Sequence, residues 1–430
     1  MSLNESTSNK YDEINVYSSS SSSPQESSPL LNEERDVVDE EERIILNEEE
    51  DRIILNEEEE RDFENATVEN QESSISRPRE RSSNFELLRI LSMFFIVMHH
   101  FSIHGEFEFS SEKVTLNRLW IQFMYMGGKI NVNIFILISG FFLVNSKKLK
   151  LSKVLKLELQ LITYSIIDFI IGIITNVKPF SLSNLVEHFF PVITNYWWFS
   201  TNYIFLYLFF PLINILINNL RKKTYSNYLI FMITIWSIIP TLYGSTSNQC
   251  SQLIWFGFLY FLAGYIRKYP IIERNIRSFI WLFFGVLSYL FTFSSALFCD
   301  ILGIYIPSLA KYYDHFFGWE KFPALLTSVL IFIAFSKMNF TSRFINLIAS
   351  STFGIYLLHD GPYMREFIWK KFLMVSNYKD NSLLIPYSMA VVFSVFTIAS
   401  IVELIRIHFF EKYYMKFIDS FSKKIEELFS

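Results

Sequence analysis

An arginine and three histidines within one apolar segment are the residues of this sequence best suited to chemistry. The segment 85–104 consists mainly of Phe, Leu, Ile and Met, yet it contains Arg89, His99, His100 and His104. In a helix, Arg89 and His100 lie about 16 Å apart along the axis and within roughly 20° of one line on its surface. Imidazole transfers protons near neutral pH, so this face predicts a general base, His100, with Arg89 as an anion-binding group.

A purely structural role for the same residues stays open at this point. An arginine near a membrane surface can extend its guanidinium toward water and pair with a neighbouring carboxylate, here Glu86. Histidines at the opposite end can be satisfied by partners at the interface. His99 points roughly 80° away from Arg89, so it is the natural control for any role assigned to His100.

The elements that position these residues are predicted to be membrane helices. From residue 85 onward, apolar runs of about 16–24 residues recur between polar breaks, and about 20 such residues cross a bilayer. We therefore expect an all-α multi-pass membrane protein with about ten transmembrane helices, a membrane domain over residues 85–415 and a short cytosolic segment over 416–430. The predicted spans are 85–104, 126–145, 157–177, 197–218, 227–244, 252–267, 278–299, 322–337, 344–360 and 384–407.

Composition supports a lipid environment and separates off a tail. The chain is 51% hydrophobic and 18% aromatic, with 46 Phe, which is too much apolar surface for a soluble fold of this size. Residues 1–84 hold 8 Lys and Arg against 24 Asp and Glu, whereas residues 85–430 hold 30 against 19. The tail has too few apolar residues to build a core and is predicted to be disordered and cytosolic. Nucleic-acid binding and a disulfide-rich secreted scaffold are excluded.

Charge placement predicts the orientation. Lys and Arg outside the spans concentrate on the side of the tail, and the positive-inside rule then puts both termini in the cytosol. The segment from Glu26 to Leu31 has the acidic-x-x-x-Leu-Leu form that vesicle-coat adaptors bind, so sorting adaptors are candidate partners. The plasma membrane and an endolysosomal or secretory membrane are both open. Cys250 and Cys299 fall on the outer side, as two thiols or as a disulfide.

The remaining ionisable residues in the spans suggest supporting roles. Asp168 lies in the middle of the third span and is expected to be a structural partner for a polar group. Glu403 and Arg406, three residues apart, predict an ion pair at a helix end. His359 and Asp360 end the ninth span and could border a cavity. No metal site is expected, because the histidines lack the close spacing with cysteines or carboxylates that zinc sites use.

Five segments together resemble the membrane acyltransferase-3 family, which consists of multi-pass O-acyltransferases known for modifying bacterial surface polysaccharides. The first span has the family's basic residue, ten residues and a histidine, as Arg89 and His100. The resemblance covers about residues 84–415 in the right order. The other motifs are Val132-Asn133-Ile-Phe135 through Ser139-Gly140, Trp198-Phe199 through Tyr203, Tyr260 through Gly264-Tyr265, and Ser351-Thr352-Phe353-Gly354-Ile355-Tyr356 through His359.

The resemblance implies acyl transfer from a cytosolic acyl-CoA co-substrate, usually acetyl-CoA, to a hydroxyl of a carbohydrate, with no bound cofactor. His100 is then the general base, while direct transfer and a covalent acyl-histidine both stay open. Arg89, Lys153 and Lys156 are the expected donor-binding residues. Orienting or structural roles are expected for the remaining motif residues Asn133, Ser139, Trp198, Tyr356 and His359.

Two other functions remain compatible with the sequence. The buried Arg and His could form the proton relay of a transporter, although no two-fold repeat with paired broken helices is visible. An inactive scaffold with the acidic tail as its docking segment is the second alternative. It draws on one departure from the family, in which Lys147, Lys148, Lys150, Lys153 and Lys156 replace the usual Arg-rich stretch.

Overall fold

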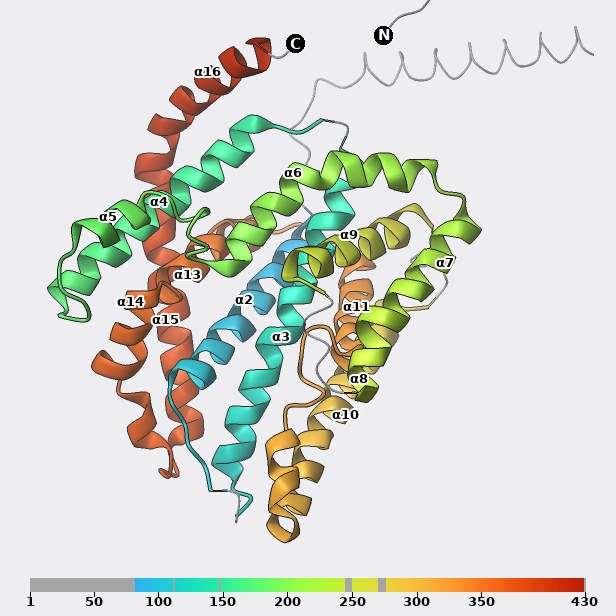
Figure 1. Ribbon diagram of the computed structural model, residues 1–430, viewed down its shortest axis with the longest axis vertical. Helices are drawn as coiled ribbons and strands as arrows, with labels where there is room; N and C mark the ends of the chain where they lie inside the picture. Colours follow the sequence, from blue (N-terminus) through green and yellow to red (C-terminus); the bar gives the residue numbers. More distant parts are fainter. Residues whose placement is uncertain (1–81, 111–112, 147, 244–249, 270–275, 429–430) are drawn as a thin grey trace, which may run out of the picture. The chain divides into compact units, whose positions relative to one another are not determined.

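The computed structural model describes residues 82–110, 113–146, 148–243, 250–269 and 276–428, and all regular structure in these ranges is helical (Figure 1). This confirms the all-α prediction. The predicted disordered tail and its sorting signal lie outside the described residues, except that α2 already begins at Ser83. The α-helices are α2 (Ser83–His104), α3 (Leu116–Leu143), α4 (Leu151–Ile174), α5 (Leu182–His188), α6 (Trp198–Asn219), α7 (Lys222–Ile233), α8 (Ile239–Tyr243), α9 (Gln252–Lys268), α10 (Ser278–Tyr305), α11 (Phe322–Ser336), α12 (Arg343–Ala349), α13 (Thr352–His359), α14 (Pro362–Arg365), α15 (Leu384–Arg406) and α16 (Lys412–Leu428).

Short helical segments of other types join several of these helices. The π-helical turn η1 (Thr234–Ile238) links α7 to α8, η3 (Glu366–Phe372) continues α14, and η5 (Ile407–Glu411) links α15 to α16. The 3₁₀ turns are η2 (Pro307–Tyr312) and η4 (Val375–Tyr378). Because α15, η5 and α16 follow one another without a gap, the backbone does not break at the predicted boundary between residues 415 and 416.

Seven helical segments of the described residues are long and apolar enough to cross a membrane. Ten crossings are not confirmed. The other three predicted spans correspond to α9 with 17 residues, α11 with 15, and the pair α12 and α13, which Ser350 and Ser351 separate. The seven segments are Ser83–His104, Leu116–Leu143, Leu151–Ile174, Trp198–Asn219, Lys222–Tyr243, Ser278–Tyr305 and Leu384–Ile425.

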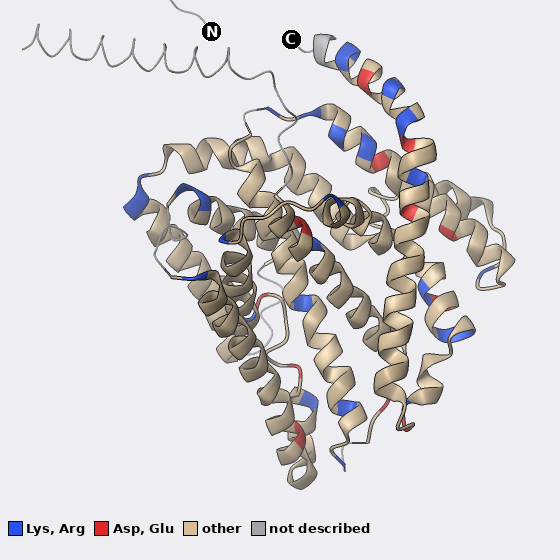
Figure 2. Ribbon diagram, turned by 180° about the vertical axis from the view of Figure 1, so that it is seen from behind, with Lys and Arg blue, Asp and Glu red and all other residues tan. Residues whose placement is uncertain are grey.

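Segments predicted to lie on one side of the membrane meet in the structure. At one end, Ser83 Oγ donates to Asn346 Oδ1 at 2.8 Å, which joins the start of α2 to α12. Lys268 Nζ donates to the carbonyl of Ile217 at 3.0 Å, which joins the ends of α9 and α6. The basic residues at the start of α4 and those of α16 also lie toward one end (Figure 2). The compartment that each end faces remains a prediction.

Close packing of α2 against α3 fixes the helix that carries the histidines. A Cβ atom at Gly128 would overlap the ring of His99, and one at Gly140 would lie 3.0 Å from atoms of Ala263 and Tyr260 on α9. Small residues at such positions let helix backbones approach each other in a membrane protein. Gly140, the residue that follows Ser139 in the second motif, therefore has a packing role.

Two predictions on supporting residues are confirmed. Asp168 is buried and accepts hydrogen bonds from the backbone N–H groups of Tyr363 (3.2 Å) and Met364 (2.7 Å), and from the hydroxyl of Tyr196. Glu403 and Arg406 form a bidentate ion pair, at 2.7 and 2.8 Å. Asp168 thus joins α4 to α14, and the ion pair rigidifies the end of α15.

The two cysteines are free thiols. Cys250 lies outside the membrane-spanning segments, where burial raises the pKa of its thiol to about 11. A thiol with such a raised pKa is almost fully protonated at neutral pH and reacts slowly.

At the opposite end from Ser83, a buried ion pair predicts a large stability effect. Asp300 accepts from the Arg118 guanidinium at 2.5 and 2.9 Å and from Gln122 Nε2 at 2.9 Å. Asp300→Asn leaves a buried guanidinium without its countercharge, so we expect the free energy of unfolding to fall by about 3 kcal/mol. Thermal unfolding in detergent, followed by tryptophan fluorescence, measures this. Asp380→Asn is the control, because that side chain is 85% exposed; an equal loss in both variants would contradict the prediction.

Candidate active site

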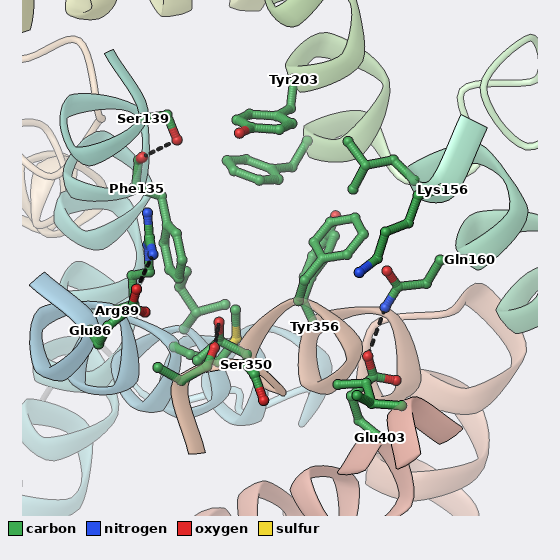
Figure 3. Close-up of a pocket in the computed structure, with 18 of the residues that line it drawn as sticks. Glu86, Arg89, Phe135, Ser139, Lys156, Gln160, Tyr203, Ser350, Tyr356 and Glu403 are labelled. Carbon is green, nitrogen blue, oxygen red and sulfur yellow. Dashed lines mark hydrogen bonds and ion pairs between the residues drawn. The ribbon is translucent and has the colours of Figure 1, made fainter. Parts of the chain in front are cut away.

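A cavity of about 420 Å³ lies among α2, α3, α4, α6, α13 and α15, and we call it the Arg89 cavity. It follows α2 from Glu86 and Arg89 to His100. Figure 3 shows Arg89 and Glu86 on one side, Lys156, Gln160 and Glu403 across from them, and the ring of Tyr356 between the two groups. The structure therefore brings Arg89, His100 and Lys156 to one cavity, as the helical spacing predicted for the first two.

Each cation that lines the Arg89 cavity has a carboxylate partner. Arg89 Nη1 donates to Glu86 Oε1 at 2.8 Å, which is the ion pair that the structural alternative anticipated. Lys156 pairs with Glu411, and Arg406 Nη2 reaches Glu411 Oε2 at 2.8 Å. Lys156 and Glu411 are 37% and 13% exposed as side chains, so this pair lies near the surface. An incoming anion would compete with Glu411 for Lys156.

At the far end of the cavity, His100 is hydrogen-bonded to a second imidazole, that of His359, which does not itself line the cavity. His100 Nδ1 and His359 Nε2 are 2.7 Å apart, and both residues are buried. His359 Nδ1 lies 2.5 Å from the carbonyl of Ile355, which can only accept a hydrogen bond. Nδ1 of His359 must then carry the proton, its Nε2 accepts, and His100 donates from Nδ1. In the neutral pair the lone pair of His100 is therefore on Nε2, the atom that a general base would use.

One carboxylate and two basic side chains lie beside the imidazole pair: those of Asp360, His104 and Arg365. Asp360 Oδ1 lies 3.7 Å from His100 Nδ1 and 3.2 Å from His104 Nε2, and Arg365 Nε is 3.9 Å from it. A buried carboxylate at this distance stabilises an imidazolium electrostatically. The grouping arises because α13, which ends at His359 and is capped by Asp360, packs against α2.

His100 also lines a second cavity, of about 200 Å³, which we call the Lys129 cavity. Ile96, His100, Val132 and Trp198 line both cavities. The Arg89 cavity follows α2 over residues 86–100 and the Lys129 cavity follows it over residues 96–104. His100 thus stands at the junction of two successive cavities.

The other candidate residues fall into two groups. Trp198 and Tyr356 line the Arg89 cavity together with Ser139, whose hydroxyl donates to the Phe135 carbonyl at 2.9 Å. Asn133 is fully buried away from both cavities, where its Nδ2 donates to the Trp319 carbonyl at 2.8 Å and its Oδ1 accepts from Trp255 Nε1 at 2.9 Å. Lys153 is exposed and does not line the Arg89 cavity.

Several lining residues were not anticipated from the sequence. Gln160 donates to Glu403 Oε1 at 2.9 Å, which fixes the carboxylate that holds Arg406. The sequence showed Glu403 and Arg406 only as an ion pair, and nothing in it places Glu411 beside Lys156.

His99 faces away from the Arg89 cavity, as expected; its Nδ1 lies 2.6 Å from the Tyr125 carbonyl.

Two buried residues and one half-buried residue of this cluster also have ligand-like spacing. His100, His104 and Asp360 each offer an atom, and these atoms lie within 4.8 Å of one another. The expectation of no metal rested on spacing along the chain, which does not register contacts between α2 and a residue 256 positions later. That expectation remains a prediction.

The fold and the site define a multi-helix membrane protein whose cavities meet at a buried histidine. The family model for acyltransferase-3, described as an acyltransferase domain, matches residues 82–404. The chain belongs to this family of membrane acyltransferases. No curated protein and no solved structure matches it.

Proposed function

We propose that this chain is an integral membrane O-acyltransferase that moves an acyl group, by expectation acetyl, from cytosolic acyl-CoA to a hydroxyl of a carbohydrate. The observation that carries the proposal is the position of His100 between the Arg89 cavity and the Lys129 cavity. One cavity can then hold the donor and the other the acceptor, with the base between them. Positioning two reactants beside one catalytic group removes much of the entropic part of the barrier.

The donor fits the Arg89 cavity because of its charges. Arg89, Lys156 and Arg406 line it, and the phosphates of CoA are bound well by such side chains. In the proposal, phosphate oxygens displace Glu411 from Lys156 near the surface. The pantetheine arm then extends past the apolar rings of Phe135, Phe199 and Phe353 and brings the thioester to His100.

The reaction follows from the proton positions at the imidazole pair. The acceptor hydroxyl gives its proton to Nε2 of His100 as its oxygen attacks the thioester carbon. The tetrahedral intermediate collapses when the carbon–sulfur bond breaks, and the leaving thiolate takes the proton from the imidazolium. Tyr356 is the candidate donor to the oxyanion, because Tyr356 lines the Arg89 cavity and its buried hydroxyl, which interacts electrostatically with Asp360, has no hydrogen bond within 3.5 Å among the described residues.

Lys156 gives a direct test of donor binding. Lys156→Ala is expected to raise KM for acetyl-CoA about tenfold, the effect of losing one charge-assisted hydrogen bond, with kcat nearly unchanged. Initial rates of CoA release measure both constants. Lys148→Ala is the charge-matched control, because Lys148 is exposed and outside the cavity. An unchanged KM in Lys156→Ala would remove this residue from the donor site, and Lys153→Ala in the same assay tests the other predicted lysine.

The reaction class is tested by CoA release from acetyl-CoA with purified protein in detergent or liposomes. A pool of sugars serves as acceptor, and the products are searched by mass for an added acetyl group. Acetylated sugar formed together with CoA supports the proposal. Absence of release with every acceptor and acyl chain length contradicts it and favours the transporter or scaffold alternatives.

A further inference from the structure

The Lys129 cavity has the composition of a sugar site and not of a lipid site. Trp198 and Trp319 are neighbours there, with ring centroids 5.0 Å apart and planes 33° from parallel. Large aromatic faces contribute apolar contact area, and the cavity adds amide and charged groups, including Gln252. A pyranose ring has this combination of apolar C–H faces and polar hydroxyls.

Of the two tryptophans, Trp319 is held by the buried amide of Asn133, which the sequence singled out. Asn133 Nδ2 donates to the Trp319 carbonyl at 2.8 Å, and Trp255 Nε1 donates to Asn133 Oδ1 at 2.9 Å. These two bonds tie the segment that carries Trp319 to α3 and α9. Asn133 therefore acts at a distance from the reacting atoms, by positioning one wall of the cavity.

Two cations in the cavity, Lys129 and Arg365, have donor groups without a hydrogen-bond partner among the described residues. Lys129 Nζ lies 4.8 Å from the Trp319 ring centroid, and within the described part of the chain it has no hydrogen-bond acceptor and no carboxylate oxygen within 4 Å. Arg365 Nη2 donates to the Asp360 carbonyl at 3.2 Å, while its Nε is buried without a hydrogen-bond partner among the described residues. Asp360, the carboxylate of this cavity, already faces His100, His104 and Arg365.

Lys129 also lines a neighbouring pocket. A pocket of about 320 Å³ shares Lys129 and Trp319 with the Lys129 cavity, and we call it the Asp314 pocket. Its lining has charges of both signs, since Asp314 and Glu320 accompany Lys129 and Lys321. Discrimination by charge is therefore expected at Lys129, which lines both spaces.

From these observations we infer that the acceptor is a pyranose with an anionic substituent, a carboxylate or a sulfate. The sugar ring packs on Trp198 and Trp319, the anionic group binds Lys129, and a hydroxyl reaches His100. The inference rests on the proposed function, because it assigns the Lys129 cavity to the acceptor. An ammonium group at the position of the anion would be repelled by Lys129, so an amino sugar is disfavoured.

The experiment compares methyl pyranosides in neutral, uronic acid and sulfated forms, with full-length protein in liposomes and saturating acetyl-CoA. We expect kcat/KM for at least one acidic form to exceed that for the neutral form about tenfold, the effect of one charge-assisted hydrogen bond. The uronic acid and sulfated arms distinguish the two anions. Lys129→Gln is expected to remove this ratio, and Lys129→Arg to keep it. Lys178→Gln, an exposed lysine over the Tyr363 ring, should leave the ratio unchanged.

The outcomes separate the inference from the proposed function. CoA release that requires His100 but is equally efficient with neutral and acidic sugars overturns the acidic acceptor and leaves the reaction standing. A preference that survives in Lys129→Gln likewise overturns the role of Lys129. If no acceptor supports release that requires His100, the proposed function fails and the inference fails with it.

Discussion

His100→Ala is expected to reduce kcat for CoA release about 10³-fold, while acetyl-CoA still binds. General-base catalysis by a positioned imidazole contributes factors of this size. Binding persists because the cations assigned to the phosphates, Arg89 and Lys156, lie toward the opposite end of the Arg89 cavity from His100. The measurements are steady-state CoA release in the presence of acceptor and equilibrium binding of acetyl-CoA, together with a thermal unfolding curve to show that the variant is folded.

The matched control for His100 is its neighbour on the same helical turn. His99→Gln keeps a side-chain donor for the Tyr125 carbonyl, which His99 Nδ1 approaches to 2.6 Å. His99 lines the Lys129 cavity, so its replacement can change KM for the acceptor. At saturating acceptor we expect kcat to stay within about tenfold of the wild-type value, because general-base catalysis does not pass through that ring. Equal turnover in wild type and His100→Ala would remove His100 from the mechanism.

The part of the site that depends on helical geometry could be predicted from the sequence. The helical period predicts that Arg89 and His100 share one face and that His99 points away from it. The structure contains this helix as α2, over Ser83–His104. The ion pair of Glu403 and Arg406 follows from the same rule over three residues. Apolar composition and the motifs together predicted the family. The match of the family model over residues 82–404 confirms this resemblance.

The part that depends on contacts between distant segments could not be predicted. His359 is 259 residues from His100, and Glu411 is 255 residues from Lys156. No periodicity relates such pairs. The first contact forms where α13 meets α2, and the second where η5 meets α4. The count of ten spans is not confirmed, and one of the three remaining predicted spans shows a related reason. In the segment 344–360 hydropathy does not reveal that the helix breaks at Ser350 and Ser351, between α12 and the helix α13 that ends at His359.

His359→Leu is expected to lower kcat about 10²-fold without changing KM for acetyl-CoA. His359 Nε2 accepts the hydrogen bond from His100 Nδ1, and without that acceptor the neutral imidazole is free to place its proton on Nε2, where it cannot act as a base. His359 lines neither the Arg89 cavity nor the Lys129 cavity, so binding of donor and acceptor is expected to persist. Steady-state kinetics separates kcat from KM.

A conservative variant distinguishes this positioning role from simple packing. His359→Gln offers a side-chain carbonyl that can accept from His100 Nδ1, so it should recover kcat to within about tenfold of wild type. A packing role would instead make Leu, which is apolar and similar in size, at least as good a replacement as Gln at a site where His359 is 1% exposed. Equal kcat values in the two variants would therefore contradict the hydrogen-bonded imidazole pair as the device that orients His100.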